Sequence, residues 1–192
     1  MAAKAPAAQP ARERLLAAAN ELFYAEGVHT VGIDRVIERA GVAKASLYNT
    51  FGSKDELVRA YLESRHTRMA ERIARHLARY ADPRGRLLSV FEAQAELFAE
   101  PGFRGCAFAS ASAESPGELV EQASAEYRSW VRALLTDLAR EAGAPAPELL
   151  GRKLHMIYDG ASLSARAERD PAVSAAARQA AETLLDAALT GH

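Results

Sequence analysis

Hydrogen-bonding side chains are crowded into the short stretch between Gly41 and Gly52. They are Lys44, Ser46, Tyr48, Asn49 and Thr50. Most of these residue types are poor helix formers, yet Leu47 and Phe51 stand four residues apart, as they would on one face of a helix. Such side chains can bind phosphates and base edges when their helix enters the major groove of DNA. A short polar helix that only faces solvent would have the same composition, so the neighbouring segments decide between the two interpretations.

The segments on either side predict a helix-turn-helix. Apolar residues at helical spacing predict a helix over residues 11–26, which ends at Gly27, and another over residues 33–40, which ends at Gly41. About three residues separate the latter from the polar helix at residues 44–51, as in a helix-turn-helix. Ser53 and Glu56 then form a capping box, which predicts a long helix over residues 53–79. The polar stretch therefore stands where a recognition helix belongs.

The rest of the chain also predicts helices. Asp82 and Pro83 supply a cap and a first-turn proline for a helix that ends near residue 100. A shorter helix follows within residues 102–114, and the prolines at 116, 145, 147 and 171 divide the remainder into helices that end near residues 142, 169 and 190. We find no alternating strand pattern bounded by turns. We therefore expect an all-α protein with about nine helices.

Composition indicates a soluble protein. Hydrophobic residues make up 49% of the chain and charged residues 26%. The single cysteine, Cys106, cannot form an internal disulfide, and no apolar run approaches the roughly 18 residues that a membrane span requires. We therefore expect a cytoplasmic location and no membrane partner. Residues 1–10, rich in alanine and proline without apolar periodicity, predict a flexible tail.

The overall charge neither favours nor excludes nucleic-acid binding. The net charge is -1, and residues 1–65 contain nine Lys or Arg against eight Asp or Glu, while residues 66–192 contain fifteen against seventeen. This is not the strongly basic balance of charges that often marks a nucleic-acid-binding protein. Any contact with DNA would have to depend on where individual cations are placed.

From Arg14 to Leu57 the chain resembles the TetR family of transcriptional regulators. The family pattern joins an apolar first helix, a glycine, a threonine and a short helix to a run close to AGV-x-K-x-x-LY-x-x-F-x-SK-x-x-L. The sequence here reads LLAAANELFYAEGVHTVGIDRVIERAGVAKASLYNTFGSKDEL. The resemblance implies a helix-turn-helix DNA-binding domain at residues 11–52 and a helical ligand-binding and dimerisation domain at residues 53–192. It also implies a regulator with no catalytic residues, no metal and no cofactor.

The resemblance, together with side-chain chemistry, assigns the DNA contacts. They are Thr30, Arg35, Lys44, Ala45, Ser46, Tyr48, Asn49, Thr50 and Lys54. Lys44, Tyr48 and Lys54 are expected at phosphates, and Ala45 could meet a thymine methyl group. Two positions depart from the family pattern. Thr50 stands where many members have histidine, and Gly32 stands where a serine or threonine often caps the second helix.

The remainder of the chain is expected to bind a small-molecule effector and a second copy of itself. In this family the last two helices form the dimer interface. Their predicted stripes are Leu149, Leu150, Leu154, Ile157 and Ala161, then Val173, Ala177, Ala180, Leu184 and Ala188. The predicted ligand-binding residues are Met69, Phe91, Cys106, Phe108, Tyr127, Trp130 and Tyr158. Core packing alone could also explain either group.

These features together predict a repressor that an effector releases from a palindromic operator. The helix at residues 53–79 would carry the signal, because Lys54 begins it beside the DNA while Met69 and Ile73 reach the expected ligand cavity. Our hypothesis is that the ligand tilts this helix and changes the separation of the two recognition helices.

Two alternatives remain at this point. Cys106 could sense electrophiles or oxidants, with Arg104 lowering the pKa of its thiol, although unpaired cysteines are commonly buried as small hydrophobic residues. A helical enzyme or a cofactor-binding bundle is the other alternative. The five histidines show no metal-ligand spacing, and the pair His155 and Asp159, four residues apart, is weak evidence for catalysis.

Overall fold

The computed structural model describes residues 10–190 of the chain. Within this range there are nine α-helices and no strand, so the all-α prediction is confirmed. The helices are α1 (Ala11–Glu26), α2 (Ile33–Ala40), α3 (Lys44–Phe51), α4 (Lys54–Leu77), α5 (Pro83–Phe98), α6 (Ala107–Glu114), α7 (Glu118–Glu141), α8 (Pro147–Glu168) and α9 (Ala172–Thr190). Of the tail predicted at residues 1–10, all but Pro10 lies outside the described residues.

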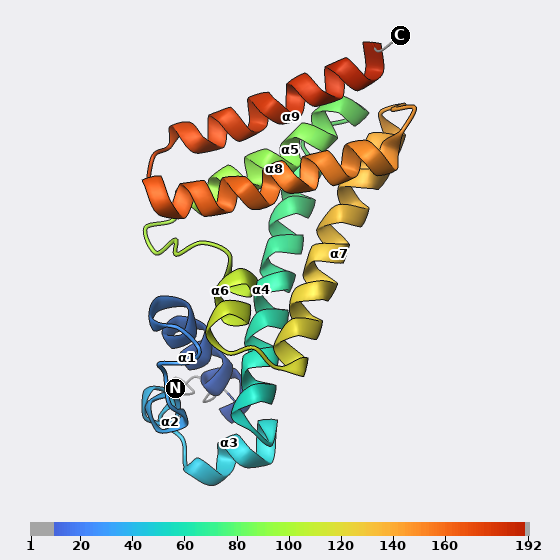
Figure 1. Ribbon diagram of the computed structural model, residues 1–192. Coiled ribbons are helices and arrows are strands. Elements are labelled where there is room, and N and C mark those ends of the chain that lie inside the picture. The colour runs from blue at the N-terminus through green and yellow to red at the C-terminus, as the bar shows by residue number, and fades with distance from the viewer. Residues whose placement is uncertain (1–9, 191–192) are drawn as a thin grey trace, which may run out of the picture.

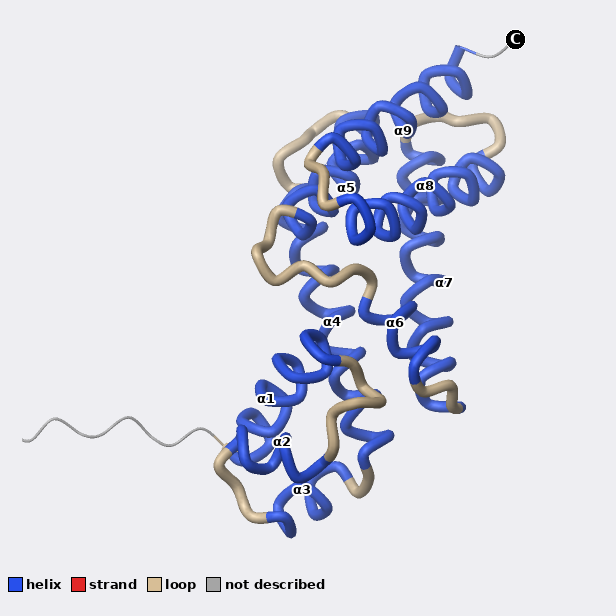
Figure 2. The backbone as a smooth tube through the Cα atoms, turned by 60° about the vertical axis from the view of Figure 1, so that its left-hand side comes forward, coloured by secondary structure: helices blue, strands red, loops and turns tan. Residues whose placement is uncertain are grey.

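The molecule is elongated, with two unlike ends (Figure 1). Helices α1, α2 and α3 form one end, and α8 and α9 lie side by side across the other. Helices α4 and α7 run lengthwise between them, and α6 packs beside both. Figure 2 shows the same division from a second direction, with α5, α8 and α9 gathered far from α3.

A small apolar core holds the first three helices together. Leu15 of α1, Val36 of α2 and Leu47 of α3 are each 0% exposed. Phe51 is half-buried, and the Arg12 guanidinium lies 5.7 Å from the centre of its ring. Leu47 and Phe51 therefore hold α3 in place, which leaves its other faces free.

The turn between α2 and α3 depends on a glycine. Gly41 has a φ of 61° and ends α2 in the left-handed conformation. This conformation is energetically unfavourable for residues that carry a side chain. The Arg14 side chain fixes this turn from α1, because its Nη1 donates to the Gly41 carbonyl oxygen at 3.0 Å. The sequence pattern did not indicate this role for Arg14.

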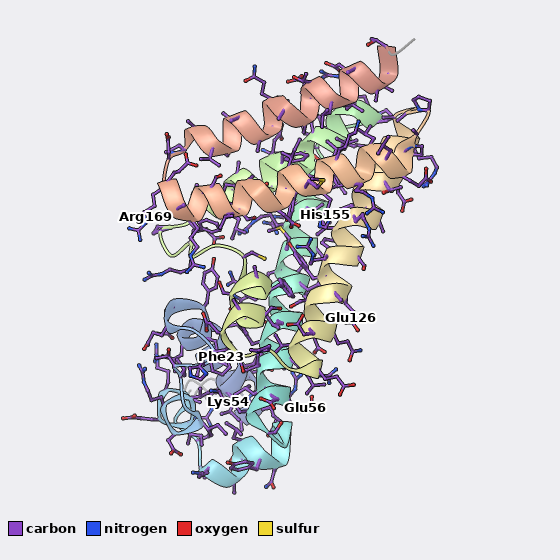
Figure 3. The ribbon with its side chains drawn as sticks, viewed as in Figure 1. Phe23, Lys54, Glu56, Glu126, His155 and Arg169 are labelled. Atoms are coloured by element: carbon purple, nitrogen blue, oxygen red, sulfur yellow. The ribbon has the colours of Figure 1, made fainter. Side chains whose placement is uncertain are left out.

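Helix α4 is anchored to the three-helix end at its first turns. The Ser53 hydroxyl accepts the backbone N–H of Glu56 at 3.1 Å, so the predicted cap is confirmed. Leu57 is fully buried, and Tyr61 meets Phe23 of α1 edge to face with ring centres 5.7 Å apart. Figure 3 shows Phe23 of α1 close to the part of α4 that begins at Lys54. The helix ends at Leu77, two residues earlier than predicted.

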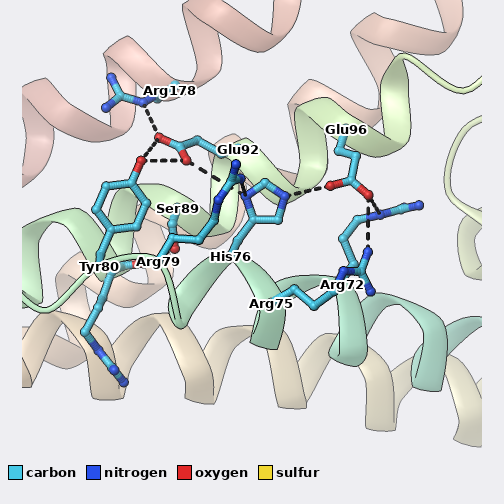
Figure 4. A network of polar contacts seen from close by, with 10 residues as sticks. Arg72, Arg75, His76, Arg79, Tyr80, Ser89, Glu92, Glu96 and Arg178 are labelled. Carbon is cyan, nitrogen blue, oxygen red and sulfur yellow. Dashed lines mark hydrogen bonds and ion pairs between the residues drawn. The ribbon is translucent and has the colours of Figure 1, made fainter.

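A polar network anchors the opposite end of α4 (Figure 4). His76 is buried, and its Nε2 lies 2.7 Å from Glu96 Oε2 on α5, while Arg72 Nε donates to Glu96 Oε1 at 3.0 Å. Glu92 of α5 accepts from the Tyr80 hydroxyl at 2.9 Å and pairs with Arg178 of α9 at 3.4 Å. The network therefore joins α4 to α5, and α5 to α9.

The apolar residues predicted for subunit association do not all face outward. Leu150, Leu154, Ala161 and Ala177 are buried within the chain, where they complete its own core. Leu149 is 54% exposed, and Met156 and Leu163, which the stripes did not include, are 69% and 71% exposed. Because these three residues are spaced by seven along α8, they lie on one outward face.

The conformation of Gly41 leads to a stability prediction. Gly41→Ala should lower the free energy of unfolding by about 1 kcal/mol, because alanine is strained at positive φ even where space is available. Gly32→Ala is the matched control: Gly32 has a φ of -77° and open space around it, so we expect a change within about 0.5 kcal/mol. Urea denaturation of both variants measures the difference, and equal stabilities would refute the argument.

Candidate DNA-binding surface and ligand cavity

The predicted DNA-binding residues lie at the free end of the molecule. On α3, Lys44, Ala45, Tyr48, Asn49 and Thr50 are exposed and Ser46 is half-buried. Thr30 and Arg35, before and within α2, are also exposed, and Lys54 is half-buried at the start of α4. Figure 1 shows α3 at the tip farthest from α9, with the first turns of α4 beside it. The fold therefore gives α3 an unobstructed outer face.

Two of the predicted cations already have partners within the chain. The Arg35 guanidinium donates to both carboxylate oxygens of Glu26, at 2.6 and 2.9 Å, and Lys44 Nζ pairs with Asp34 Oδ1 at 3.0 Å. The hydrogen bond that Lys44 donates to Asp34 raises the pKa of Lys44, and the hydrogen bonds that Arg35 donates to Glu26 raise the pKa of Arg35. Exposed pairs of this kind contribute little stability, so phosphates can replace these carboxylates.

The hydroxyl of Thr50, where many family members have histidine, is engaged within α3. Its Oγ1 donates to the Ser46 carbonyl oxygen one turn back at 2.6 Å. The hydroxyl proton is therefore used inside the helix, and the oxygen can only accept a further hydrogen bond. In this rotamer Thr50 therefore cannot donate a hydrogen bond to DNA, whereas a histidine ring at the same position could.

Two neighbouring cavities open in the larger part of the molecule. The larger, of about 680 Å³, is bounded by α6, α7 and α8, and the smaller, of about 120 Å³, by α4, the end of α5, the segment before α6, the first turn of α6, α7 and α8. Cys106, Phe108 and Tyr127 line both. Met69 and Tyr158 line the smaller one. Five of the seven predicted ligand-binding residues are therefore brought together.

Phe91 and Trp130, the other two predicted ligand-binding residues, line neither cavity. Phe91 is 1% exposed and packs against Tyr158, with ring centres 6.3 Å apart. The Trp130 ring packs on His66 at 4.7 Å. The structure places these two rings in the packing around the cavities.

Aromatic rings form the wall that the two cavities share. The rings of Phe108 and Tyr127 are stacked, with centres 4.0 Å apart and an interplanar angle of 3°. The hydroxyls of Tyr127 and Tyr158 lie 3.1 Å apart, and burial raises the pKa of both well above the ordinary value. Both phenols are therefore neutral, and they offer a ligand hydrogen bonds and no charge.

The structure contradicts the idea that Arg104 lowers the pKa of the Cys106 thiol. Burial raises this pKa, and the opposing effect comes chiefly from the backbone N–H groups of Ala109 and Phe108, with a smaller one from Arg128. Arg104 uses its own backbone N–H to donate to the Tyr24 hydroxyl at 3.0 Å. The thiol is therefore protonated at neutral pH and is a weak nucleophile.

A contact that the sequence did not reveal joins α1 to the segment beside the cavities. The Tyr24 hydroxyl accepts from the Arg104 N–H and donates to the Gly105 carbonyl oxygen, both at 3.0 Å. The Arg65 guanidinium of α4 lies 3.8 Å from the centre of the Tyr24 ring. Gly105, Cys106 and Arg65 all line the smaller cavity. A change in that cavity can thus reach α1 through Tyr24 as well as through α4.

Solved structures and a family profile resemble this chain. A TetR-family transcriptional regulator from Streptomyces coelicolor, SCO4454, is 35% identical, covers 93% of this chain and 95% of its own, and superposes with a TM-score of 0.87. This chain belongs to the TetR family of transcriptional regulators. The profile of the bacterial regulatory proteins of the tetR family matches residues 15–61. The TetR protein described here is therefore a helix-turn-helix DNA-binding regulator of transcription.

Other relatives agree with this assignment. The TetR regulator sav143 from Streptomyces avermitilis is 34% identical over 94% of this chain and 98% of its own, with a TM-score of 0.81. The HTH-type transcriptional activator FasR of Mycolicibacterium smegmatis is 39% identical over 82 residues, which are 43% of this chain and 37% of FasR. The match with FasR thus spans little more than a third of that protein.

The described residues were considered above as a possible metal site and as a possible membrane span, and they form neither. Among residues 10–190, no three His, Cys, Asp or Glu side chains are grouped so that they could hold a metal ion. In the same range, every helix is too short or too polar to cross a membrane.

The ion pair of Lys44 leads to a prediction about DNA affinity. Asp34→Asn should tighten binding to DNA of any sequence about three- to tenfold at low salt, because it removes a repelling charge and frees Lys44 for a phosphate. The dependence of log affinity on log salt should steepen by about one unit or less. Asp137→Asn, which breaks the exposed Asp137–Arg140 pair of α7, is the control and should change neither. Gel-shift titrations at several salt concentrations decide, and an unchanged affinity for Asp34→Asn would argue against a phosphate role for Lys44.

The raised pKa of Cys106 predicts slow alkylation. At pH 7.5 the folded protein should react with iodoacetamide several-fold more slowly than glutathione, because only the thiolate is an effective nucleophile. Unfolding in urea should restore the rate of an ordinary cysteine. Mass spectrometry of the modified protein measures both rates, and a folded rate above that of glutathione would mean that the thiol is activated.

Proposed function

We propose that this TetR protein is a homodimeric repressor that binds an inverted-repeat operator and is released from it by a small molecule in the cavities. The observation that carries the proposal is the geometry of α3. Its buried residue Leu47 and half-buried Phe51 fix it to the core, while its polar residues face outward at the tip of the molecule. A recognition helix requires this division.

The proposed contacts divide into phosphate and base contacts. Lys44, Tyr48 and Lys54 bind phosphates, with Thr30 and Arg35 flanking the groove. Ala45, Ser46, Asn49 and Thr50 lie along the groove-facing side of α3, where they meet base edges or nearby phosphates. Residues 11–52 form the DNA-binding domain, and residues 53–192 form the ligand-binding and dimerisation domain.

The dimer forms through α8 and α9. Leu149, Met156 and Leu163 lie on one outward face of α8, and each is more than half exposed. Apolar side chains repeated in this way on an outward face are typical of a protein contact. A second copy of the chain related by a two-fold axis would cover them and set the two recognition helices on an inverted repeat.

The effector acts by moving α4 and α1. Helix α4 runs without interruption from Lys54 at the DNA to Met69 at the smaller cavity, and Tyr24 links α1 to the segment before α6. A ligand that prefers a different arrangement of this wall would tilt α4 and change the separation of the recognition helices. No cofactor is needed for this step, and the cytoplasm, where chromosomal DNA is accessible, is the expected location.

Selection of bound DNA from a random pool tests the proposal. We expect one inverted repeat to be enriched and bound with a Kd on the order of nanomolar at moderate salt. Lys54→Ala should weaken binding about tenfold or more for all sequences and should flatten the salt dependence. Arg140→Ala, which removes an exposed cation from α7, should change neither the affinity for DNA nor its salt dependence. Failure to enrich an inverted repeat would refute the proposal.

A further inference from the structure

The larger cavity is lined by more positive than negative charge. Arg128, Arg132 and Arg166 face it, against Glu121 and Asp159. Arg128 Nη1 pairs with Asp159 Oδ2 at 2.7 Å, and Arg166 Nη1 donates to the Ser110 hydroxyl at 3.1 Å. Among the residues that the structure describes, no carboxylate lies within ion-pair distance of Arg132. Arg132 therefore presents an uncompensated positive charge to the cavity.

A buried histidine beside Arg132 lacks a hydrogen-bond partner. His155 is 6% exposed and lines the cavity from α8, on the side that faces α7 (Figure 3). Its Nε2 is buried without a hydrogen bond, and the Asp159 carboxylate is 3.6 Å away, too far for one. A buried polar atom left unsatisfied destabilises the protein, so this atom requires a partner that the chain does not supply.

The charges around His155 keep it neutral. Burial lowers the pKa of His155, and the positive charges of Arg128 and Arg132 on α7 lower it further, while Asp159 on α8 opposes them. The cavity thus carries three arginines against two carboxylates, with a neutral imidazole between them. A cationic ligand would be repelled, and an uncharged one would gain no charge interaction with Arg132.

The rest of the wall suits an apolar body. The stacked rings of Phe108 and Tyr127 line the cavity from α6 and α7, and the hydroxyls of Ser112 and Ser124, 3.0 Å apart, already satisfy one another. The volume of about 680 Å³ is in the range of cavities for drug-sized ligands. Room therefore remains beyond the charged end for a ring or an alkyl chain.

We propose that this cavity binds an organic carboxylate, whose oxygens pair with the Arg132 guanidinium and accept a hydrogen bond from His155 Nε2 while its apolar body lies along Phe108 and Tyr127. Carboxylate oxygens match both groups, because they accept from a guanidinium and from an imidazole N–H. The inference rests on the proposed function, in which the cavities hold the effector, and it adds the chemical class of that effector.

Calorimetric titration of the full-length protein with matched acids and amides tests the inference. The probes are 2-naphthoate with 2-naphthamide and decanoate with decanamide, at pH 7, where both acids are ionised. At least one acid should bind about tenfold or more tightly than its amide. Arg132→Gln should abolish most of that preference and change amide binding about twofold or less.

Two further variants sharpen the test. His155→Gln should also reduce acid binding. Because His155 is buried, circular dichroism is used to check that the His155→Gln variant is folded. If it is not, Arg132→Gln still tests the inference, because Arg132 is exposed and its substitution should not disturb the core. Arg140→Gln, on α7 but outside the cavity lining, should bind both probes as the unmodified protein does. Equal binding of acid and amide, no binding of either at millimolar concentration, or an acid preference that survives Arg132→Gln would overturn the inference.

DNA selection with the same preparation separates this inference from the proposed function. An enriched inverted repeat without a preference for acids would reject the carboxylate and leave the DNA-binding proposal standing. A preference for acids without any enriched DNA would support the cavity chemistry and reject the repressor.

Discussion

The anchoring of α4 at both ends is the constraint on which the rest of the structure depends. At its first turn, Ser53 caps the helix, and the buried Leu57 and Tyr61 fix it to α1. Near its last turn, His76 and Arg72 fasten it to Glu96 of α5. Between these points the helix is continuous, so a displacement at one end must appear at the other or break an anchor. A short recognition helix can thereby respond to events far along the molecule.

The segment before α6 provides a second connection between the two ends. Tyr24 reaches from α1 to hydrogen-bond the backbone at Arg104 and Gly105, and α6 begins with residues that line both cavities. At the far end of α6, the Glu114 carboxylate accepts the His29 backbone N–H at 3.5 Å. A ligand that moves α6 would therefore displace the loop between α1 and α2 as well as α4. The connection through α6 and the connection through α4 both lead to helices α1, α2 and α3.

Features that depend on nearby residues could be predicted from the sequence, and features that depend on tertiary packing could not. The cap at Ser53, the left-handed turn at Gly41 and the bounds of α1, α2 and α3 follow from residues a few positions apart. Helical periodicity does not separate the two apolar faces of α8, so it predicts Leu150 in a dimer contact, whereas Leu150 completes the core of its own chain. Arg132 and His155 lie on different helices, so their spacing in the sequence does not reveal that they line one cavity. The pKa of Cys106 depends on burial, which sequence proximity to Arg104 did not reveal.

The central claim is that cavity occupancy changes the separation of the two recognition helices through α4. Its most direct test is the distance between spin labels on the two subunits, attached at Glu38→Cys on the exposed side of α2 in a Cys106→Ser background. Pulsed electron paramagnetic resonance should give one narrow distance distribution with the selected DNA and a distribution displaced by several ångströms with a carboxylate that releases the DNA. An identical distribution under both conditions would contradict the account.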